Sequence, residues 1–219
     1  MKNIDKRLRA ILNEINGHTL IDVGCDHGKV TCQALIEKRV DRAVAVDISD
    51  KSLQKCRDLA KKLNLENIDF RCSDGLNAIK PDELDNVVIA GMGGYEIIKI
   101  LSRCQEKINK LILCPHQDVE VLRDYLKDKF FIEKDYCIHL DNHFYSLIVL
   151  HDGVTSLTKK ELLLGKDSLD NEDYKEYLEF LKTKYEKILS QNVPDDRRKE
   201  CEEILEIIGD EIDDSKENI

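Results

Sequence analysis

The sequence lacks a long hydrophobic run, since none of its 219 residues belongs to a stretch of about eighteen consecutive apolar residues. A transmembrane helix needs about that length, so the sequence predicts no membrane span. The first residues, 1–7, also lack the apolar core of a signal peptide. We therefore expect a cytoplasmic protein.

Paired cysteines are missing as well. The chain has eight cysteines, but none of them forms a Cys-x-x-Cys pair of the kind that zinc sites and redox motifs use. Cys72, Cys114 and Cys137 lie in or at the ends of apolar segments, where a free thiol behaves as a small hydrophobic group. The sequence therefore predicts buried, reduced cysteines, a reducing compartment and no bound metal.

An excess of positive charge is also absent, because the formal net charge is −10. This charge is unevenly distributed: residues 1–151 hold 23 basic and 24 acidic residues, whereas residues 152–219 hold 11 and 20. The near-neutral first part carries basic clusters at 2–9 and 61–62. Such clusters are usually solvated helix faces, but they leave a nucleic-acid partner open.

The sequence does contain a regular alternation of apolar strands and amphipathic helices from Thr19 to Leu150. This alternation is typical of a largely parallel sheet with helices on both faces. Only four residues separate the last two strands, too few for a crossover helix, so they form an antiparallel hairpin. The predicted strands are 19–23, 42–47, 68–72, 85–90, 110–114, 131–139 and 144–150, and the predicted helices are 4–15, 28–38, 50–63, 94–104 and 118–129, the last one capped by Asp118.

The pattern changes after Gly153. Apolar residues recur at steps of four and three from Tyr174 to Ile188, which predicts a helix over 171–190 with a short coiled-coil seam. Pro194 interrupts it before a second amphipathic helix, so a helical hairpin is expected, with an acidic, frayed end over 210–219. We expect a main domain at 1–153 and an appendage at 154–219.

Acidic residues and glycines follow three of the predicted strands. Asp22 and Gly24 lie where the first strand turns into a helix, as in a nucleotide-cofactor cradle. Asp47 closes the second strand 25 residues after Asp22, about the spacing at which a carboxylate binds a ribose. Asp74 and Gly75 follow the third strand, where they could read an adenine edge. The three strand ends predict one adenosine-like ligand.

Several motifs together closely resemble the bacterial tRNA (adenine-22-N1)-methyltransferase family. They are Lys6-Arg7-Leu8, Asp22-Val23-Gly24-Cys25-Asp26-His27, the segment 85–94 with the sequence DNVVIAGMGG, and the segment 111–115. The resemblance runs from about Lys6 to Leu150, and the predicted helical hairpin resembles the coiled-coil appendage of the family. It implies an α/β, Rossmann-like class I methyltransferase with a mostly parallel seven-stranded sheet, a terminal antiparallel hairpin and a C-terminal helical hairpin.

The resemblance also implies a reaction, in which a methyl group moves from S-adenosylmethionine to N1 of adenine 22 in tRNA. Methyl transfer from a sulfonium needs no metal. The sequence leaves the oligomeric state open, with a monomer as one expectation. A carboxylate aimed at the adenine N6 group would stabilise the charge that develops on the ring, so Asp26 is the catalytic candidate, with His27 beside it. His116 stands where the family commonly has asparagine. The implied cofactor-binding residues are Arg7, Asp22, Gly24, Asp47, Ile48, Asp74, Gly75, Ala90, Gly91 and Met92, and the implied RNA-binding residues are Arg7, Arg9, Lys29 and His116.

Other interpretations of these residues and of the function stay open. Asp26 could be the N-cap of the following helix, His27 could only close the turn, and Met92 could be core filler. The chain could also methylate a small molecule, a protein or another RNA site, or it could bind the cofactor in an interaction module without catalysis.

Overall fold

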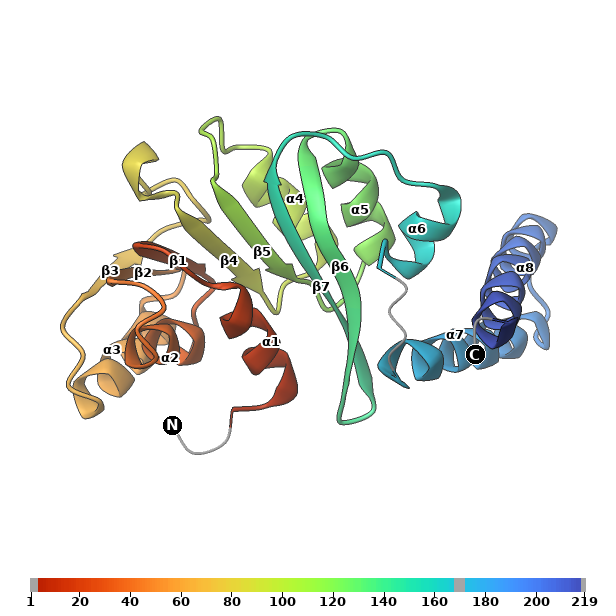
Figure 1. Ribbon diagram of the computed structural model, residues 1–219, viewed down its shortest axis with the longest axis horizontal. Helices are drawn as coiled ribbons and strands as arrows, with labels where there is room; N and C mark the ends of the chain where they lie inside the picture. Colours follow the sequence, from red (N-terminus) through yellow and green to blue (C-terminus); the bar gives the residue numbers. More distant parts are fainter. Residues whose placement is uncertain (1–3, 168–171, 218–219) are drawn as a thin grey trace.

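The computed structural model of the protein describes residues 4–167 and 172–217. Its centre is one seven-stranded sheet with the order β3-β2-β1-β4-β5-β7-β6 (Figure 1). The first five strands are parallel, and β7 runs antiparallel to both β5 and β6. The predicted fold class is therefore confirmed. The strands are β1 Thr19–Val23, β2 Arg42–Asp47, β3 Ile68–Cys72, β4 Asn86–Ala90, β5 Lys110–Cys114, β6 Phe130–Leu140 and β7 His143–Asp152.

Helices cover both faces of the sheet, and those within the sheet region begin and end within three residues of their predicted bounds. None of the helices in the described part of the chain is long and apolar enough to cross a membrane. The helices are α1 Lys6–Glu14, α2 Lys29–Ile36, α3 Asp50–Lys62, α4 Gly94–Leu101, α5 Val119–Lys127, α6 Lys159–Leu164, α7 Glu172–Leu189 and α8 Asp195–Glu217, with a 3-10 turn at Pro81–Glu83.

The core consists of apolar layers on the two sides of the sheet. On one side, α1 and α2 pack on the strands through residues such as Leu12 and Ala34, and α3 continues this layer through Leu53. On the other side, α4 and α5 pack through residues such as Ile97 and Leu122. Because both faces of the central strands are covered, every residue of β1 is buried.

Local predictions failed at two places in this part of the chain. Asp118 does precede α5, but it has a positive φ of 56° and its side chain makes no capping hydrogen bond. Cys72 is exposed at the end of β3, whereas Cys114 and Cys137 are buried as predicted. All eight cysteines are free.

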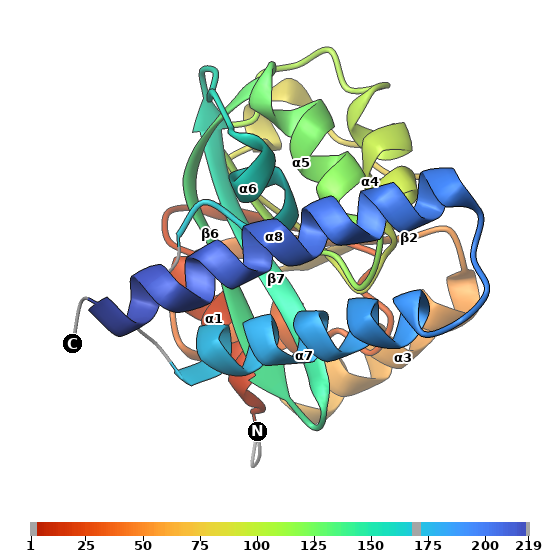
Figure 2. The same ribbon diagram turned by 90° about the vertical axis from the view of Figure 1, so that its right-hand side faces the viewer.

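The C-terminal helices form the predicted hairpin, with α7 and α8 side by side beyond β6 (Figure 2). Asn171, the predicted first residue of this hairpin, lies outside the described residues. The prediction of a frayed end over 210–219 is wrong as far as Glu217, because α8 continues to that residue, and 218–219 lie outside the described residues. Glu211 explains this: it is buried, accepts a hydrogen bond of 2.9 Å from the Tyr174 hydroxyl and forms an ion pair with Lys160.

The chain after Gly153 also holds the outer edge of β6. The Ile132 N–H donates to Thr155 Oγ1 at 2.7 Å, and the Asp135 N–H donates to the Asp167 carboxylate at 2.7 Å. Further along the strand, the His139 N–H donates to the Asp173 carboxylate at 3.1 Å. Side chains from the appendage thus take the place of a neighbouring strand. The domain boundary at 153 stays a prediction.

A buried ion pair ties α5, β6 and α6 together. Arg123 makes two hydrogen bonds to the Asp135 carboxylate, from Nε at 2.7 Å and from Nη2 at 3.0 Å. Its Nη1 donates to the carbonyls of Leu162 and Leu163 at the end of α6, and Nη2 also donates to Ser146 Oγ. The two charged side chains are 2% and 0% exposed, so each depends on the other for its solvation.

We expect the substitution Arg123→Met to lower the free energy of unfolding by about 3–5 kcal/mol, because it leaves the Asp135 carboxylate buried without its partner. Urea unfolding followed by circular dichroism would measure the loss. The double variant Arg123→Met/Asp135→Leu should recover most of it. As a control on the same helix, Lys127→Met removes only an exposed pair with Asp124 and should leave stability nearly unchanged. Equal losses in the Arg123 and Lys127 single variants would contradict this account.

Candidate functional site

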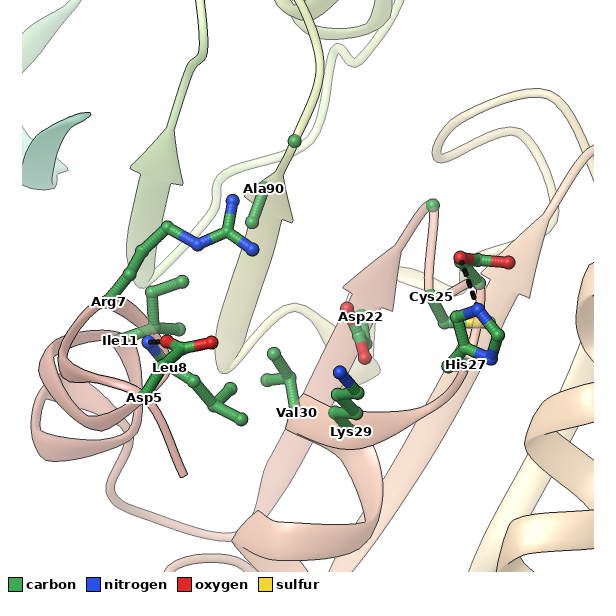
Figure 3. Close-up of a pocket in the computed structure, with 13 residues that line it drawn as sticks. Asp5, Arg7, Leu8, Ile11, Asp22, Cys25, His27, Lys29, Val30 and Ala90 are labelled. Carbon is green, nitrogen blue, oxygen red and sulfur yellow. Dashed lines mark hydrogen bonds and ion pairs between the residues drawn. The ribbon is translucent and has the colours of Figure 1, made fainter. Parts of the chain in front are cut away.

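Two cavities lie at the edge of the sheet where the parallel strands end, and both are lined by Gly24. They measure about 290 and 240 Å³, so together they reach the size of a nucleoside-binding pocket. The first is enclosed by α1, the turn after β1 and the end of β4 (Figure 3). The second lies between the ends of β2 and β3 and the start of α4.

The turn after β1 needs glycine at both of its ends. Gly24 has a φ of 74°, and a Cβ there would come within 2.3 Å of the Met92 methyl group. Gly28 has a φ of 67°, and a Cβ there would come within 2.2 Å of Cys56 Sγ. The turn therefore fits closely against its neighbours. Met92 packs against the apolar core, as expected of core filler, and it also lines the second cavity, as expected of a cofactor-binding residue. Both interpretations of Met92 therefore describe part of its environment.

Asp22 is the buried acid of the first cavity, with 4% of the residue exposed. Its carboxylate accepts hydrogen bonds from the Thr31 hydroxyl at 2.6 Å and the Thr31 N–H at 3.2 Å. Burial nevertheless dominates and raises the pKa of Asp22 to about 6. A cationic group in this cavity would favour the ionised carboxylate.

Asp47 lies in the second cavity with its carboxylate held by two backbone groups. The Ser49 N–H donates to it at 2.8 Å, and the Asp26 N–H donates to it at 3.3 Å. Ile48 beside it is 73% exposed. Asp74 and Gly75 line the same cavity, and the Asp74 carboxylate forms an ion pair of 2.6 Å with Arg103.

Asp26 and His27 line the first cavity. The N-cap of α2 is Gly28, with no side-chain capping bond, so the alternative in which Asp26 caps this helix is wrong. Instead, the half-exposed Asp26 carboxylate contacts Lys55 Nζ at 3.0 Å and His27 Nε2 at 3.3 Å. Figure 3 shows the His27 side chain with its contact to this carboxylate. Asp26 itself adopts a positive φ of 35°.

Arg7 extends from α1 into the first cavity, with its guanidinium toward Ala90 (Figure 3). The guanidinium carbon lies 4.9 Å from the centre of the Tyr145 ring. Its Nε is buried and has no hydrogen-bond partner among the described residues. A buried donor of this kind calls for an acceptor, and a carboxylate in the cavity would supply one.

The remaining predicted RNA-binding residues lie in different places. Lys29 lines the first cavity. Arg9 lines neither cavity, and its guanidinium forms an ion pair of 2.8 Å with the Glu37 carboxylate. His116 is exposed and lines neither cavity; its backbone N–H donates to the Met92 carbonyl at 3.1 Å.

Sequence reasoning missed several residues at the two cavities. Glu96 and Lys99 of α4 line the second one, and their place in the helix after Gly93-Gly94 was a usable signal. Lys55 and Tyr145 line neither cavity but contact the lining residues Asp26 and Arg7. They come from distant elements and carried no such signal. Among the described residues, no group of histidine, cysteine and acidic side chains has the arrangement of a metal site.

Comparison with known proteins connects these cavities to a family. A family model described as a methyltransferase domain matches residues 4–148, which include all residues that line the two cavities. The chain belongs to this family. In this methyltransferase, the matched region ends within β7 and leaves the C-terminal helices outside.

The chain is also similar to individual proteins of known or assigned activity. The tRNA (adenine(22)-N(1))-methyltransferase of Bacillus subtilis is 31% identical over 156 residues, which cover 68% of this chain and just under two thirds, 66%, of that protein. The structure of M. capricolum TrmK in complex with S-adenosyl-homocysteine is 28% identical, with a TM-score of 0.85 over 96% of this chain and 98% of that one. The structure of B. subtilis TrmK, an m1A22 tRNA methyltransferase, is 25% identical, with a TM-score of 0.79 over 97% and 100%. These similarities confirm the resemblance to the tRNA (adenine-22-N1)-methyltransferase family that the sequence motifs indicate.

The raised pKa of Asp22 predicts a pH dependence of ligand affinity. S-adenosylhomocysteine carries an ammonium group, which favours the ionised form of Asp22. Its affinity for this methyltransferase should therefore rise as the pH increases through about 6 and level off above it. Calorimetric titration at a series of pH values would measure this, and Asp22→Asn should remove the dependence. If affinity changes with pH equally in the unsubstituted protein and in Asp22→Asn, the pH dependence belongs to another group.

Proposed function

We propose that this protein transfers a methyl group from S-adenosylmethionine to N1 of adenine 22 in tRNA. One observation carries the proposal: all ten residues predicted to bind the cofactor line the two cavities that Gly24 joins. The family supports the reaction class, and the names of the relatives support tRNA as the substrate. The chain works, on this proposal, in the cytoplasm; that it acts as a monomer stays a prediction.

The residues present fit the cofactor in a definite orientation. The second cavity suits the adenosine part, with Asp47 for the ribose hydroxyls and Asp74 and Gly75 for the adenine edge. The first cavity suits the methionine part, because Asp22 favours an ammonium group and Arg7 Nε, which lacks a hydrogen-bond partner within the described part of the chain, favours a carboxylate. When bound, S-adenosylmethionine supplies a methyl group attached to a positively charged sulfur.

The chain's main task is then to position the adenine. N1 of adenine has a free lone pair at neutral pH, so no proton must be removed before the transfer. Holding that lone pair in line with the methyl group can lower the barrier by about 7–11 kcal/mol. The mouth of the first cavity, beside the methionine part and with the exposed Asp26, His27 and Lys29 around it, is the place where the base would be held.

Asp26 has the chemistry to assist the transfer. Positive charge spreads onto the adenine ring as N1 gains the methyl group, and the N6 amino group becomes more acidic. The half-exposed Asp26 carboxylate, held between Lys55 and His27, would accept a hydrogen bond or a proton from N6. His27 would orient the base or the carboxylate.

A labelling experiment tests the function directly. The protein is incubated with radiolabelled S-adenosylmethionine and an unmodified tRNA transcript with adenine at position 22, beside the same transcript with guanine there. We expect label in the first transcript and none in the second. Label in both would move the target to another site. Label in neither, with cofactor binding demonstrated, would favour a small-molecule substrate or a binding module.

The role of Asp26 predicts a specific kinetic defect. We expect Asp26→Asn to lower kcat for the adenine-22 transcript by about 10²-fold or more, while the affinity for S-adenosylhomocysteine stays nearly unchanged. As a control, Asp58→Asn changes an exposed acid on α3 whose carboxylate accepts a hydrogen bond of 2.9 Å from the Gln54 amide, and it should have no effect. Near-full kcat in Asp26→Asn would remove this residue from the mechanism.

A further inference from the structure

The hairpin of β6 and β7 extends past the rest of the sheet on the side where the cavities open. The last pair between β5 and β7 joins Leu113 and Ile148, whereas the pairs between β6 and β7 continue to Leu140 and His143. Since β5 ends at Cys114, the end of the hairpin projects beyond the carboxyl ends of the parallel strands (Figure 1). The projection stands beside α1, which forms one wall of the first cavity.

The projecting end is a well-defined structure. Asp141 and Asn142 connect the strands and have φ values of 50° and 62°, as the two central residues of a tight hairpin turn require. On one face, His139 stacks on Phe144 with ring centres 4.4 Å apart, and Phe144 packs against Tyr177 of α7. The appendage therefore supports this face of the hairpin.

The other face carries a row of flat groups that leads away from the first cavity. Arg7 lines the cavity, and its guanidinium lies over the Tyr145 ring. The centre of the Tyr145 ring lies 6.3 Å from the centre of the His143 ring, and His143 is exposed at the tip of the hairpin. The row Arg7, Tyr145, His143 is thus continuous from the candidate methyl-transfer site to the end of the hairpin.

The proposed reaction creates a need for such a surface. N1 lies on the base-pairing edge of adenine, so the base must leave its stack to reach the first cavity. Its departure leaves a neighbouring base with one face unstacked, at a cost of a few kcal/mol. An aromatic ring can cover that face, and base–aromatic stacking does not depend on base identity.

We propose that His143, with Tyr145 behind it, stacks on a nucleobase next to the target adenine and holds the opened RNA strand at the mouth of the cavity. This inference rests on the proposed function and adds a residue for substrate positioning to it. It concerns RNA affinity, because neither ring belongs to the residues that line the cavities.

A double-mutant cycle between protein and RNA tests the stacking contact. The protein variants are His143→Ala, which removes the ring, and His143→Phe, which keeps one. The RNAs are the intact adenine-22 transcript and two transcripts with an abasic site at the nucleotide before or after the target. KM and kcat are measured for each pair, and RNA affinity is measured by fluorescence anisotropy.

We expect His143→Ala to raise KM and the dissociation constant for the intact transcript by about tenfold, with kcat nearly unchanged. His143→Phe should restore most of the loss. With one of the two abasic transcripts, the difference between His143→Ala and the unsubstituted protein should disappear. His18→Ala is the matched control, since His18 is an exposed histidine just before β1, at the amino end of the parallel strands, and should behave as the unsubstituted protein.

Two results would overturn the inference. One is an unchanged KM in His143→Ala, and the other is a loss of equal size with the intact and both abasic transcripts, which would mean that the ring contacts no base. If the unsubstituted protein binds the transcript without methylating it, the proposed function fails. The anisotropy cycle then still decides whether His143 stacks on RNA.

Discussion

The burial of the central strands on both faces is the constraint on which this structure depends. With α1, α2 and α3 on one side and α4 and α5 on the other, β1, β2, β4 and β5 have no solvent-facing surface in their middle. Polar chemistry is therefore confined to the strand ends, and the parallel order brings those ends to one edge. Asp22 is the exception within β1, and its raised pKa shows the cost of an acid at that depth.

The same constraint explains why much of the site could be predicted from the sequence. Apolar runs with sharp polar ends give strand bounds to within two residues, because a strand covered on both faces tolerates few polar side chains. The acids and glycines that follow those runs must then meet at the carboxyl edge, as Asp22, Asp47 and Asp74 do. At these positions the local sequence marks the strand ends, and the parallel topology brings those same ends together.

The partners of these residues could not be predicted in the same way. Lys55 of α3 lies beside Asp26, and Arg103 of the turn after α4 lies beside Asp74. Each pair joins segments 29 residues apart, so its contact depends on tertiary packing that no local pattern encodes. Local rules also failed where tertiary contacts outweigh them. The acidic run at the end of α8 stays helical because Glu211 is buried among partners, although its composition favours disorder.

The hydrogen bonds along the outer side of β6 bear on how this protein behaves at high concentration. A strand of eleven residues at the edge of a sheet would offer its free N–H groups to any other extended chain, including a second copy of itself. Thr155, Asp167 and Asp173 occupy three of these groups from within the same molecule. The C-terminal segment thereby keeps this edge from pairing with another extended chain. A shortened chain that ends after β7 would be prone to self-association through this edge.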